Sequence, residues 1–248
     1  MIVLLTDFGD SEYVGVMRGV ILSLSPTSQI VDLTHSVPPQ SVREGAWILL
    51  QDYKYFPHGS IFVAVIDPGV GTDRDAVMVR TSNYVFIGPD NGLIYSACQD
   101  DGIVSTSRLV VGLSASYTFH GRDVFARAGA LLDAGREEEI EQAPKDGLSS
   151  VLEFHREGRT GEVVRIDRFG NIVTNLVPMS GGSLSKTKYV LRTPGTSKDL
   201  TLFNTYAEGP KDGLFLVVGS YGTLEITSQN RPASSLLNLK VGDRLDLE

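Results

Sequence analysis

The chain has 248 residues and a formal net charge of −8; 42% of its residues are hydrophobic and 21% are charged. This composition is typical of a globular protein, and the length allows one large domain or two smaller ones. The acidic balance disfavours nucleic acid as a partner, because phosphates are bound by clustered lysine and arginine. No apolar run approaches the ~20 residues that cross a bilayer, and the start of the chain lacks the basic region of a signal peptide. With its single cysteine, Cys98, we expect a cytoplasmic protein without nucleic-acid or membrane partners.

The N-terminal part of the chain alternates short apolar strands with amphipathic helices. Strands are predicted over residues 2–6, 29–33, 61–66, 76–80, 84–87 and 105–111, and helices over 12–24, 42–55, 93–99 and 124–132. Ser41 and Glu44 have the spacing of a capping box at the start of the second helix. Because such alternation is typical of a mostly parallel sheet covered by helices, we predict an α/β domain over residues 1–152.

From about Gly161 the pattern changes to short strands separated by Gly, Ser, Pro, Asn and Asp. The predicted strands cover residues 162–166, 189–193, 214–218, 222–227 and 244–247. No helical pattern separates them. We therefore predict a smaller all-β, sandwich-like or barrel-like domain over residues 160–248, joined to the first by a linker within 144–158.

Polar side chains follow several strands of the predicted α/β sheet. They are Asp7 and Asp10, Asp32 with His35, Asp67 with Arg74, Asp90 with Asn91, and His120 with Arg122 and Asp123. Each group alone also fits an ordinary turn, and Asp67 in particular fits a residue that caps its own backbone. Together, at the ends of strands that share a sheet edge, they predict a polar cleft.

The motifs of several other kinds of site are missing from the sequence. With four histidines, no HxH or HExxH spacing and no cysteine pair, we expect no metal centre. The glycines after Asp67 lack a P-loop lysine, and no GxSxG elbow is present. His120 precedes a predicted helix, whose N-terminus favours a neutral, proton-accepting imidazole; a histidine hydrogen-bonded in a loop fits as well.

Residues 165–175 of the β domain predict two strands around a turn that holds Asp167, Phe169 and Asn171. An ordinary hairpin accounts for this pattern. A binding site accounts for it too, with Phe169 stacked on a base and Asn171 hydrogen-bonded to the edge of that base.

Seven motifs in fixed order carry a family resemblance: TDFGD, DLTHSVPP, VIDPGVG with Arg74, GPDNGLI, TFHGRDVF, IDRFGNIVTN and GSYGTLEIT. Together they resemble the S-adenosylmethionine hydroxide adenosyltransferases, which are relatives of the fluorinases and chlorinases. The resemblance implies an α/β N-terminal domain, a barrel-like C-terminal domain and a homotrimer whose sites lie between one subunit's N-terminal domain and its neighbour's C-terminal domain. It also implies hydrolysis of S-adenosylmethionine to adenosine and L-methionine, without a cofactor or metal.

By the same resemblance, Asp67, Arg74 and His120 are the catalytic residues. Arg74 holds the attacking water, while Asp67 and His120 orient it and accept its proton; which of the two takes the proton stays open. The residues implied to bind substrate are Asp7 at the ribose, Phe169, Asn171, Tyr206 and Asn230 at the adenine, Asp167, Ser220 and Tyr221 at the methionine, and also Phe119.

The chain departs from the fluorinases at three positions of the resemblance. Fluorinases carry an aromatic residue at the position of Asp67, a serine at that of Gly121 and a tryptophan at that of Gln40. A halide-dependent adenosyl transferase is therefore the second hypothesis. A non-catalytic sensor of S-adenosylmethionine or adenosine is the third, although a sensor has no use for the three catalytic side chains.

Overall fold

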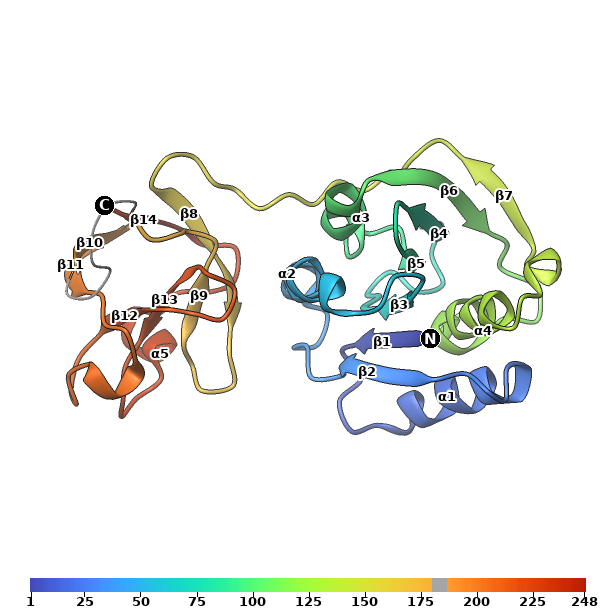
Figure 1. The fold of residues 1–248 in the computed structure, drawn as a ribbon, viewed down its shortest axis with the longest axis horizontal. Coiled ribbons are helices and arrows are strands. Elements are labelled where there is room, and N and C mark those ends of the chain that lie inside the picture. The colour runs from blue at the N-terminus through green and yellow to red at the C-terminus, as the bar shows by residue number, and fades with distance from the viewer. Residues whose placement is uncertain (180–186) are drawn as a thin grey trace. The chain divides into compact units, whose positions relative to one another are not determined.

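The computed structural model describes residues 1–179 and 187–248. The chain divides into two compact units, Met1–Glu153 and Phe154–Glu248, and Figure 1 shows the elements of each. In the described residues, none of the helices combines the length and the apolar character that a membrane crossing needs.

The N-terminal unit is built on a seven-stranded sheet of order β2-β1-β3-β5-β4-β6-β7. Its strands are β1 (Ile2–Thr6), β2 (Ile30–Thr34), β3 (Ile61–Val65), β4 (Ala76–Thr81), β5 (Val85–Pro89), β6 (Ile103–Leu109) and β7 (Gln142–Lys145). Neighbours from β2 to β5 pair in parallel, whereas β4 is antiparallel to both β5 and β6, and β7 is antiparallel to β6. The predicted mostly parallel α/β sheet is confirmed. β7 was not predicted, because its sequence QAPK has no strand pattern.

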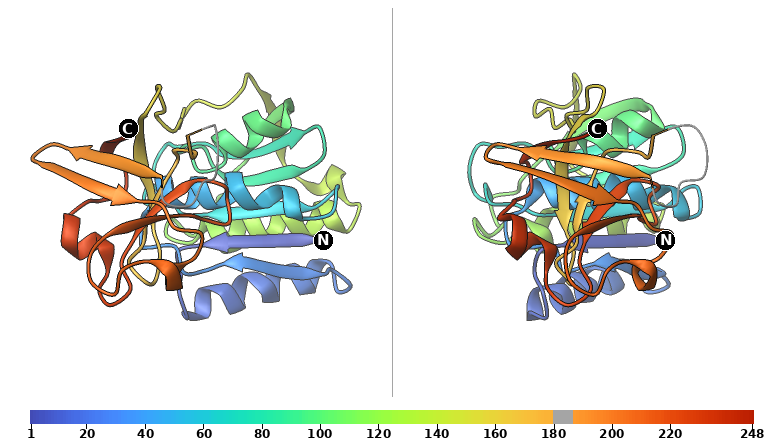
Figure 2. Two further views of the ribbon diagram at one scale, coloured as in Figure 1. Left: turned by 60° about the vertical axis from the view of Figure 1, so that its left-hand side comes forward. Right: turned by 90° about the vertical axis from the view of Figure 1, so that its left-hand side faces the viewer.

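Helices cover both faces of this sheet. They are α1 (Glu12–Leu24), α2 (Val42–Asp52), α3 (Tyr95–Asp101) and α4 (Arg127–Asp133). Side chains of α1 and α4 share one core with the sheet, and those of α2 and α3 share the other. Figures 1 and 2 show the ribbons of these helices around the sheet. The fully apolar strands β1, β3 and β5 lie between the two cores, which explains why they read as continuous hydrophobic runs.

Two details of the predicted helices are wrong. The capping box does not form: Ser41, with ψ 71°, lacks the extended backbone of an N-cap and its side chain makes no capping hydrogen bond, while Glu44 is buried. The last helix begins earlier than predicted. A π-helical segment, Gly121–Ala126, directly follows His120 and continues into α4. Such segments occur often at functional sites.

The C-terminal unit is a second seven-stranded sheet, of order β11-β10-β14-β8-β9-β13-β12, with all pairs antiparallel. Its strands are β8 (Thr160–Ile166), β9 (Ile172–Thr174), β10 (Lys188–Thr193), β11 (Thr196–Thr201), β12 (Phe215–Val218), β13 (Leu224–Thr227) and β14 (Arg244–Leu247). A bridge between Leu202 and Leu216 brings its two edges together. The predicted barrel-like all-β domain is confirmed. The short helix α5 (Ala233–Leu237) was not predicted.

Gly88 in β5 provides a test of this packing. A Cβ at Gly88 would overlap the backbone carbonyl oxygen of Ala64 in β3, which cannot rotate away. We expect Gly88→Ala to lower the free energy of unfolding by about 1–3 kcal/mol, measured by urea denaturation. Gly19→Ala is the matched control: it lies in α1 with open space around it, and the change should raise stability by about 0.4–1 kcal/mol. Equal effects of the two substitutions would contradict the close approach of β5 to β3.

Candidate active site

Three of the predicted side chains meet in the N-terminal unit: Asp67, Arg74 and His120. Arg74 donates its Nε–H to Asp67 Oδ1 over 3.0 Å and an Nη2–H to Asp67 Oδ2, which makes a two-pronged ion pair. The same Nη2 lies 2.8 Å from His120 Nδ1. The pair is well covered, with 6% of the Asp67 side chain and 10% of the Arg74 side chain exposed, and His120 is buried. Protein surroundings of this kind strengthen a charge-assisted hydrogen bond relative to water.

The contact with Arg74 also defines the protonation of His120. A guanidinium has only donors, so Nδ1 accepts the hydrogen bond and carries no proton. Burial lowers the pKa of His120, and the Arg74 cation lowers it further, against opposing effects of Asp67 and Asp123. His120 is therefore neutral near pH 7, with its proton on Nε2. Burial and Arg74 are the causes found here, whereas the sequence-based prediction of a neutral His120 invoked the helix N-terminus.

Two loops that are distant in the sequence bring the three side chains together. Asp67 and Arg74 lie in the loop between β3 and β4, and His120 lies directly before the π-helical segment. Gly71, with φ 78°, packs against the Tyr117 carbonyl so closely that a Cβ would overlap that oxygen. A glycine is therefore needed where the first loop contacts the second.

Neighbouring groups hold this arrangement in place. Asn91, from the GPDNGLI motif, donates its Nδ2–H to the carbonyl of Ile66 over 2.8 Å and so fixes the backbone just before Asp67. The Arg74 guanidinium lies over the Phe125 ring, 5.4 Å from the centroid. Asp90 of the same motif accepts hydrogen bonds from the backbone N–H groups of residues 149 and 150, so its role is structural.

Asp67 and His120 line a cavity of about 340 Å³, and so do Asp7 and Phe119. Asp7, at the end of β1, accepts a hydrogen bond on Oδ2 from the backbone N–H of Gln40, which also lines the cavity, over 2.7 Å. The structure therefore places one predicted substrate-binding carboxylate in the same cavity as two members of the trio. Arg74 does not line the cavity itself, but it is hydrogen-bonded to both Asp67 and His120.

The aromatic wall on this cavity was predicted only in part: Phe119 was expected at the substrate, whereas Phe8 and Tyr13 were not. Phe119 packs edge to face against Phe8 and Tyr13, at centroid distances of 6.0 and 5.0 Å, and all three line the cavity. Tyr13 is 46% exposed although it belongs to this cluster. The only signal was a Tyr and a Phe near the polar strand-end motifs, and such residues equally indicate core packing.

The C-terminal unit brings together a second predicted set. A cavity of about 710 Å³ is lined by five of the predicted substrate-binding residues: Asp167, Phe169, Asn171, Tyr206 and Asn230. The Phe169 ring is 71% exposed at the tip of the β8–β9 hairpin. Ser220 and Tyr221 lie in the loop between β12 and β13 and do not line this cavity.

Internal hydrogen bonds fix the polar groups of this second cavity. Asp167 accepts the backbone N–H groups of Phe169 and Asn171 on Oδ1, at 2.8 and 2.9 Å, and the Asn171 Nδ2–H on Oδ2 at 2.8 Å. Thr227 donates its hydroxyl to Asn171 Oδ1 over 2.5 Å. Asp167 therefore closes the hairpin turn and orients the Asn171 amide, so the hairpin and the binding-site interpretations are compatible.

A buried carboxylate beside this cavity was also missed. Glu225 in β13 accepts the Tyr206 hydroxyl on Oε2 over 2.8 Å. Burial raises the pKa of Glu225 above its ordinary value, although the bond from Tyr206 opposes the shift; burial also raises the pKa of Tyr206. The sequence signal was a glutamate inside the apolar strand LEIT, where an acid needs a partner.

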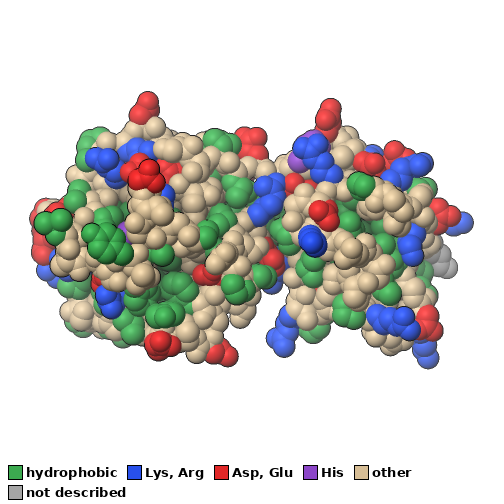
Figure 3. Space-filling model, turned by 180° about the vertical axis from the view of Figure 1, so that it is seen from behind, with side chains coloured by type: hydrophobic (Ala, Val, Ile, Leu, Met, Phe, Trp, Pro, Cys, Tyr) green, Lys and Arg blue, Asp and Glu red, His purple; other side chains and the backbone are tan. Residues whose placement is uncertain are grey.

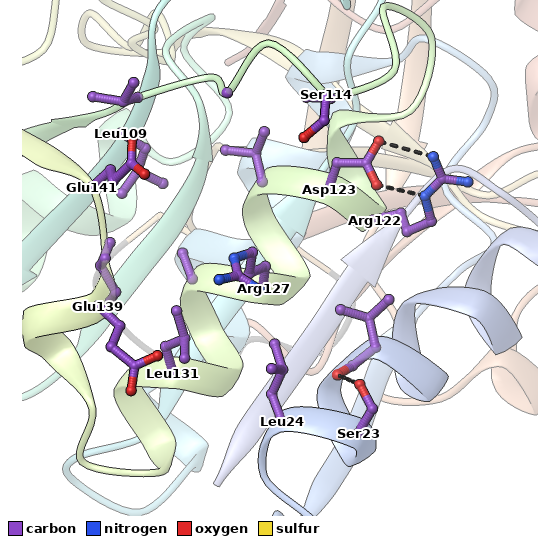
Figure 4. A pocket seen from close by; sticks show the side chains of 17 residues that line it. Ser23, Leu24, Leu109, Ser114, Arg122, Asp123, Arg127, Leu131, Glu139 and Glu141 are labelled. Atoms are coloured by element: carbon purple, nitrogen blue, oxygen red, sulfur yellow. Dashed lines mark hydrogen bonds and ion pairs between the residues drawn. The ribbon is translucent and has the colours of Figure 1, made fainter.

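A larger cavity in the N-terminal unit, of about 520 Å³, lies between α1 and α4 and is drawn in Figure 4. Arg122 and Asp123 at its edge are paired with each other, and Glu139 is paired with Arg136. None of the predicted catalytic or substrate-binding residues lines this cavity, so it is a weaker candidate than the smaller one.

Neither the face drawn in Figure 3 nor the grouping of the described metal-ligating side chains points to a nucleic acid or a metal ion as ligand. On the face drawn in Figure 3, lysine and arginine are interspersed with acidic residues instead of forming one basic patch. Within residues 1–179 and 187–248, no group of three or more His, Cys, Asp or Glu side chains is arranged to hold a metal ion.

Family models decide the relationship of this chain to known proteins. Residues 2–142 match the SAM hydroxide adenosyltransferase N-terminal domain and residues 161–246 match the C-terminal domain of the same family. The chain belongs to the SAM hydroxide adenosyltransferase family. The resemblance seen in the seven motifs is thereby confirmed.

Individual members of the SAM hydroxide adenosyltransferase family match over nearly the full length. Proteins named (R)-S-adenosyl-L-methionine hydrolase are 34% identical in Salinispora arenicola, covering 97% of this chain and 94% of that one, and 35% identical in Methanocaldococcus jannaschii, covering 100% and 95%. A fluorinase from an Actinoplanes species is more distant, at 25% identity over 98% and 95%. The crystal structure of an uncharacterized conserved protein from Thermotoga maritima has a TM-score of 0.86 and 30% identity and covers 100% of both chains.

The protonation of His120 in this family member can be tested directly. We expect the His120 pKa, measured by NMR titration, to lie below the ~6.5 of an unperturbed histidine. Arg74→Met should raise it, because a nearby cation that disfavours imidazolium is removed. Arg136→Met, which removes an exposed arginine paired with Glu139, is the control and should leave the value unchanged. A His120 pKa that does not respond to Arg74→Met would show that the contact is absent in solution.

Proposed function

We propose that this protein hydrolyses S-adenosyl-L-methionine to adenosine and L-methionine, with water attacking C5′ of the ribose. The observation that carries the proposal is the hydrogen-bonded group of Asp67, Arg74 and His120 beside a cavity that also contains Asp7. Relatives covering nearly the whole chain are named for hydrolysis of the (R) epimer, and we extend that specificity to this chain.

The chemistry of the substrate explains what such a site has to do. The sulfonium is a good leaving group: as the new C5′–O bond forms, the C5′–S bond breaks and its electron pair stays on sulfur, giving neutral methionine. No acid has to protonate the leaving group, and we propose that neither a metal nor a cofactor takes part. The remaining task is to orient a water and remove its proton, and general-base assistance contributes ~10²–10⁴-fold to rate.

The hydrogen bonds favour Asp67 as the proton acceptor. His120 carries its proton on Nε2 and uses Nδ1 to accept from Arg74, so its remaining ring group is a donor. That donor suits the oxygen of the attacking water. Asp67 keeps acceptor capacity on both oxygens, and Arg74 stabilises its charge until the proton arrives.

Two observations disfavour a halide nucleophile. The Asp67 carboxylate would repel an anion in the same cavity. Gly121 has no hydroxyl to coordinate one, and a Cβ at this position would meet Phe119 Cε2 at 3.2 Å and Met17 Sδ at 3.3 Å. A non-catalytic sensor is disfavoured because burying an ion pair is costly and simple ligand binding does not need one.

We further propose that the active unit is a homotrimer, in which the N-terminal cavity of one subunit and the C-terminal cavity of its neighbour enclose one substrate. In support, Asp67 and His120 line a cavity of the N-terminal unit, and the predicted adenine-binding residues line a cavity of the C-terminal unit. The aromatic side chains Tyr13, Phe169 and Tyr206 are 46%, 71% and 48% exposed, and exposed aromatic groups are typical of binding surfaces.

The buried thiol of Cys98 fits our expectation of a cytoplasmic protein.

The reaction is tested in ¹⁸O-water, with and without chloride, by mass spectrometry of the nucleoside. We expect labelled oxygen at the adenosine 5′ position and no 5′-chloro product.

Asp67→Ala should lower kcat by about 10²-fold or more while adenosine affinity changes little, because the proton acceptor is lost and the base-binding groups are kept. Asp123→Ala, in an acid paired with Arg122, controls for a general effect of losing a carboxylate near His120. Full activity of Asp67→Ala would contradict the assignment of Asp67 as the proton acceptor.

The shared site is tested by mixing two inactive variants, Asp67→Ala and Asn171→Ala, after unfolding and refolding them together. If each site combines two subunits, about a quarter of all sites receive both intact halves when equal amounts of the variants assemble at random into trimers, and activity returns. If each site belongs to one chain, the mixture stays as inactive as the separate variants. Refolded wild type measures the recovery of the procedure.

A further inference from the structure

Gln40 has an unusual backbone conformation next to the candidate site. Its φ is 64°, and within the described residues only Asn238, with φ 52°, shares this property among non-glycine residues. The left-handed region costs roughly 1–2 kcal/mol for a residue with a Cβ, and glutamine is not among the residues that adopt it readily. A conformation of this kind persists only where its surroundings impose it.

The local hydrogen bonds indicate what this conformation achieves. The Gln40 N–H points at Asp7 Oδ2, 2.7 Å away, and among the described residues it is the one donor bonded to that carboxylate. One residue later the chain turns into α2, with Val42 N–H donating to the Gln40 carbonyl over 2.9 Å. The positive φ thus lets the chain enter the helix while the N–H stays aimed at Asp7.

Other contacts already fix the loop after β2 against the loop after β1. The Gly9 N–H donates to the His35 carbonyl over 2.8 Å, and Thr6 Oγ1 lies 2.8 Å from His35 Nδ1. The hydrogen bond from Gln40 is therefore not needed to join the two loops. Its specific effect is on the direction of the Asp7 carboxylate, because it engages Oδ2 and leaves Oδ1 for a ligand.

We propose that Gln40 is a positioning residue that acts through its backbone: its left-handed N–H orients Asp7 for the hydroxyl groups of the ribose. The inference rests on the proposed function only for the identity of the ligand. Gln40 is an exposed residue at the cavity, and the hydrogen bond to Asp7 comes from its backbone N–H and not from its side chain. Position 40 should then tolerate any side chain that is compatible with positive φ.

A substitution series separates a backbone role from a side-chain role. Gln40→Gly, Gln40→Asn and Gln40→Val all remove the glutamine side chain, but Gly and Asn accept positive φ whereas the β-branched Val does not. We expect the Kd for adenosine and the KM for S-adenosylmethionine to stay within about threefold for Gly and Asn and to rise about tenfold for Val, with kcat nearly unchanged. Equal losses in all three variants, or a Val variant that binds like wild type, would overturn the proposal.

Asn238→Val is the matched control, because it imposes the same backbone conflict at the end of α5, outside the lining of either candidate cavity. It should lower the unfolding temperature as Gln40→Val does, yet leave adenosine binding unchanged. If Asn238→Val also weakened binding, general destabilisation would account for the effect and the proposal would fail.

Hydrogen exchange gives a readout that does not depend on any substrate. The Gln40 amide belongs to an exposed residue, so without its bond to Asp7 it should exchange rapidly. We expect protection of this amide in the free protein and at least tenfold faster exchange in Asp7→Ala, followed by NMR. A protein that fails to bind adenosine but shows this protection would contradict the proposed function alone, whereas rapid exchange in the wild type would overturn the role of Gln40.

Discussion

The buried ion pair between Asp67 and Arg74 is the interaction on which the candidate site depends. Removing two charges from water is expensive, and a well-packed apolar pair of similar volume is often as stable or more so. Removing one partner would leave an uncompensated buried charge, at a cost of about 3–5 kcal/mol. The pair is therefore poorly explained as a stabilising device. It is well explained as a preorganised field, in which Arg74 fixes the direction of Asp67 and the proton position of His120 together.

The side chains that create this electrostatic field come from segments that are far apart in the chain. The β3–β4 loop carries the carboxylate and the guanidinium, and the segment before α4 carries the imidazole. Both depend on groups outside the lining of the cavity: Gly71, which lets the second loop approach closely, and Asn91, which fixes the backbone before Asp67. Phe125, in the π-helical segment before α4, then supports the guanidinium. This explains why three of the seven ordered motifs converge on one small region.

The sequence was a good guide wherever a pattern is local. Strand and helix periodicity located nearly every element, and polar residues at strand ends located the cavity. It was a poor guide wherever the decisive contact is distant. The bond from Tyr206 to Glu225 spans 19 residues, and no local pattern indicates it. One local pattern also failed: the capping box of Ser41 and Glu44 had the right spacing, yet the backbone at Ser41 excludes it and Glu44 is buried.

The polar and the aromatic groups of the two cavities differ in how far they are fixed without a ligand. Charged and polar groups are already hydrogen-bonded: Asp67 with Arg74 in one unit, and Asn171 with Asp167 in the other. Of the aromatic groups around them, Phe169 and Tyr206 stay largely exposed. Polar groups have to be oriented in advance, because their reorganisation during a reaction is costly, whereas exposed rings gain most when a nucleoside covers them. The polar groups are therefore held rigidly before the substrate binds, and the exposed rings provide apolar surface that the substrate covers.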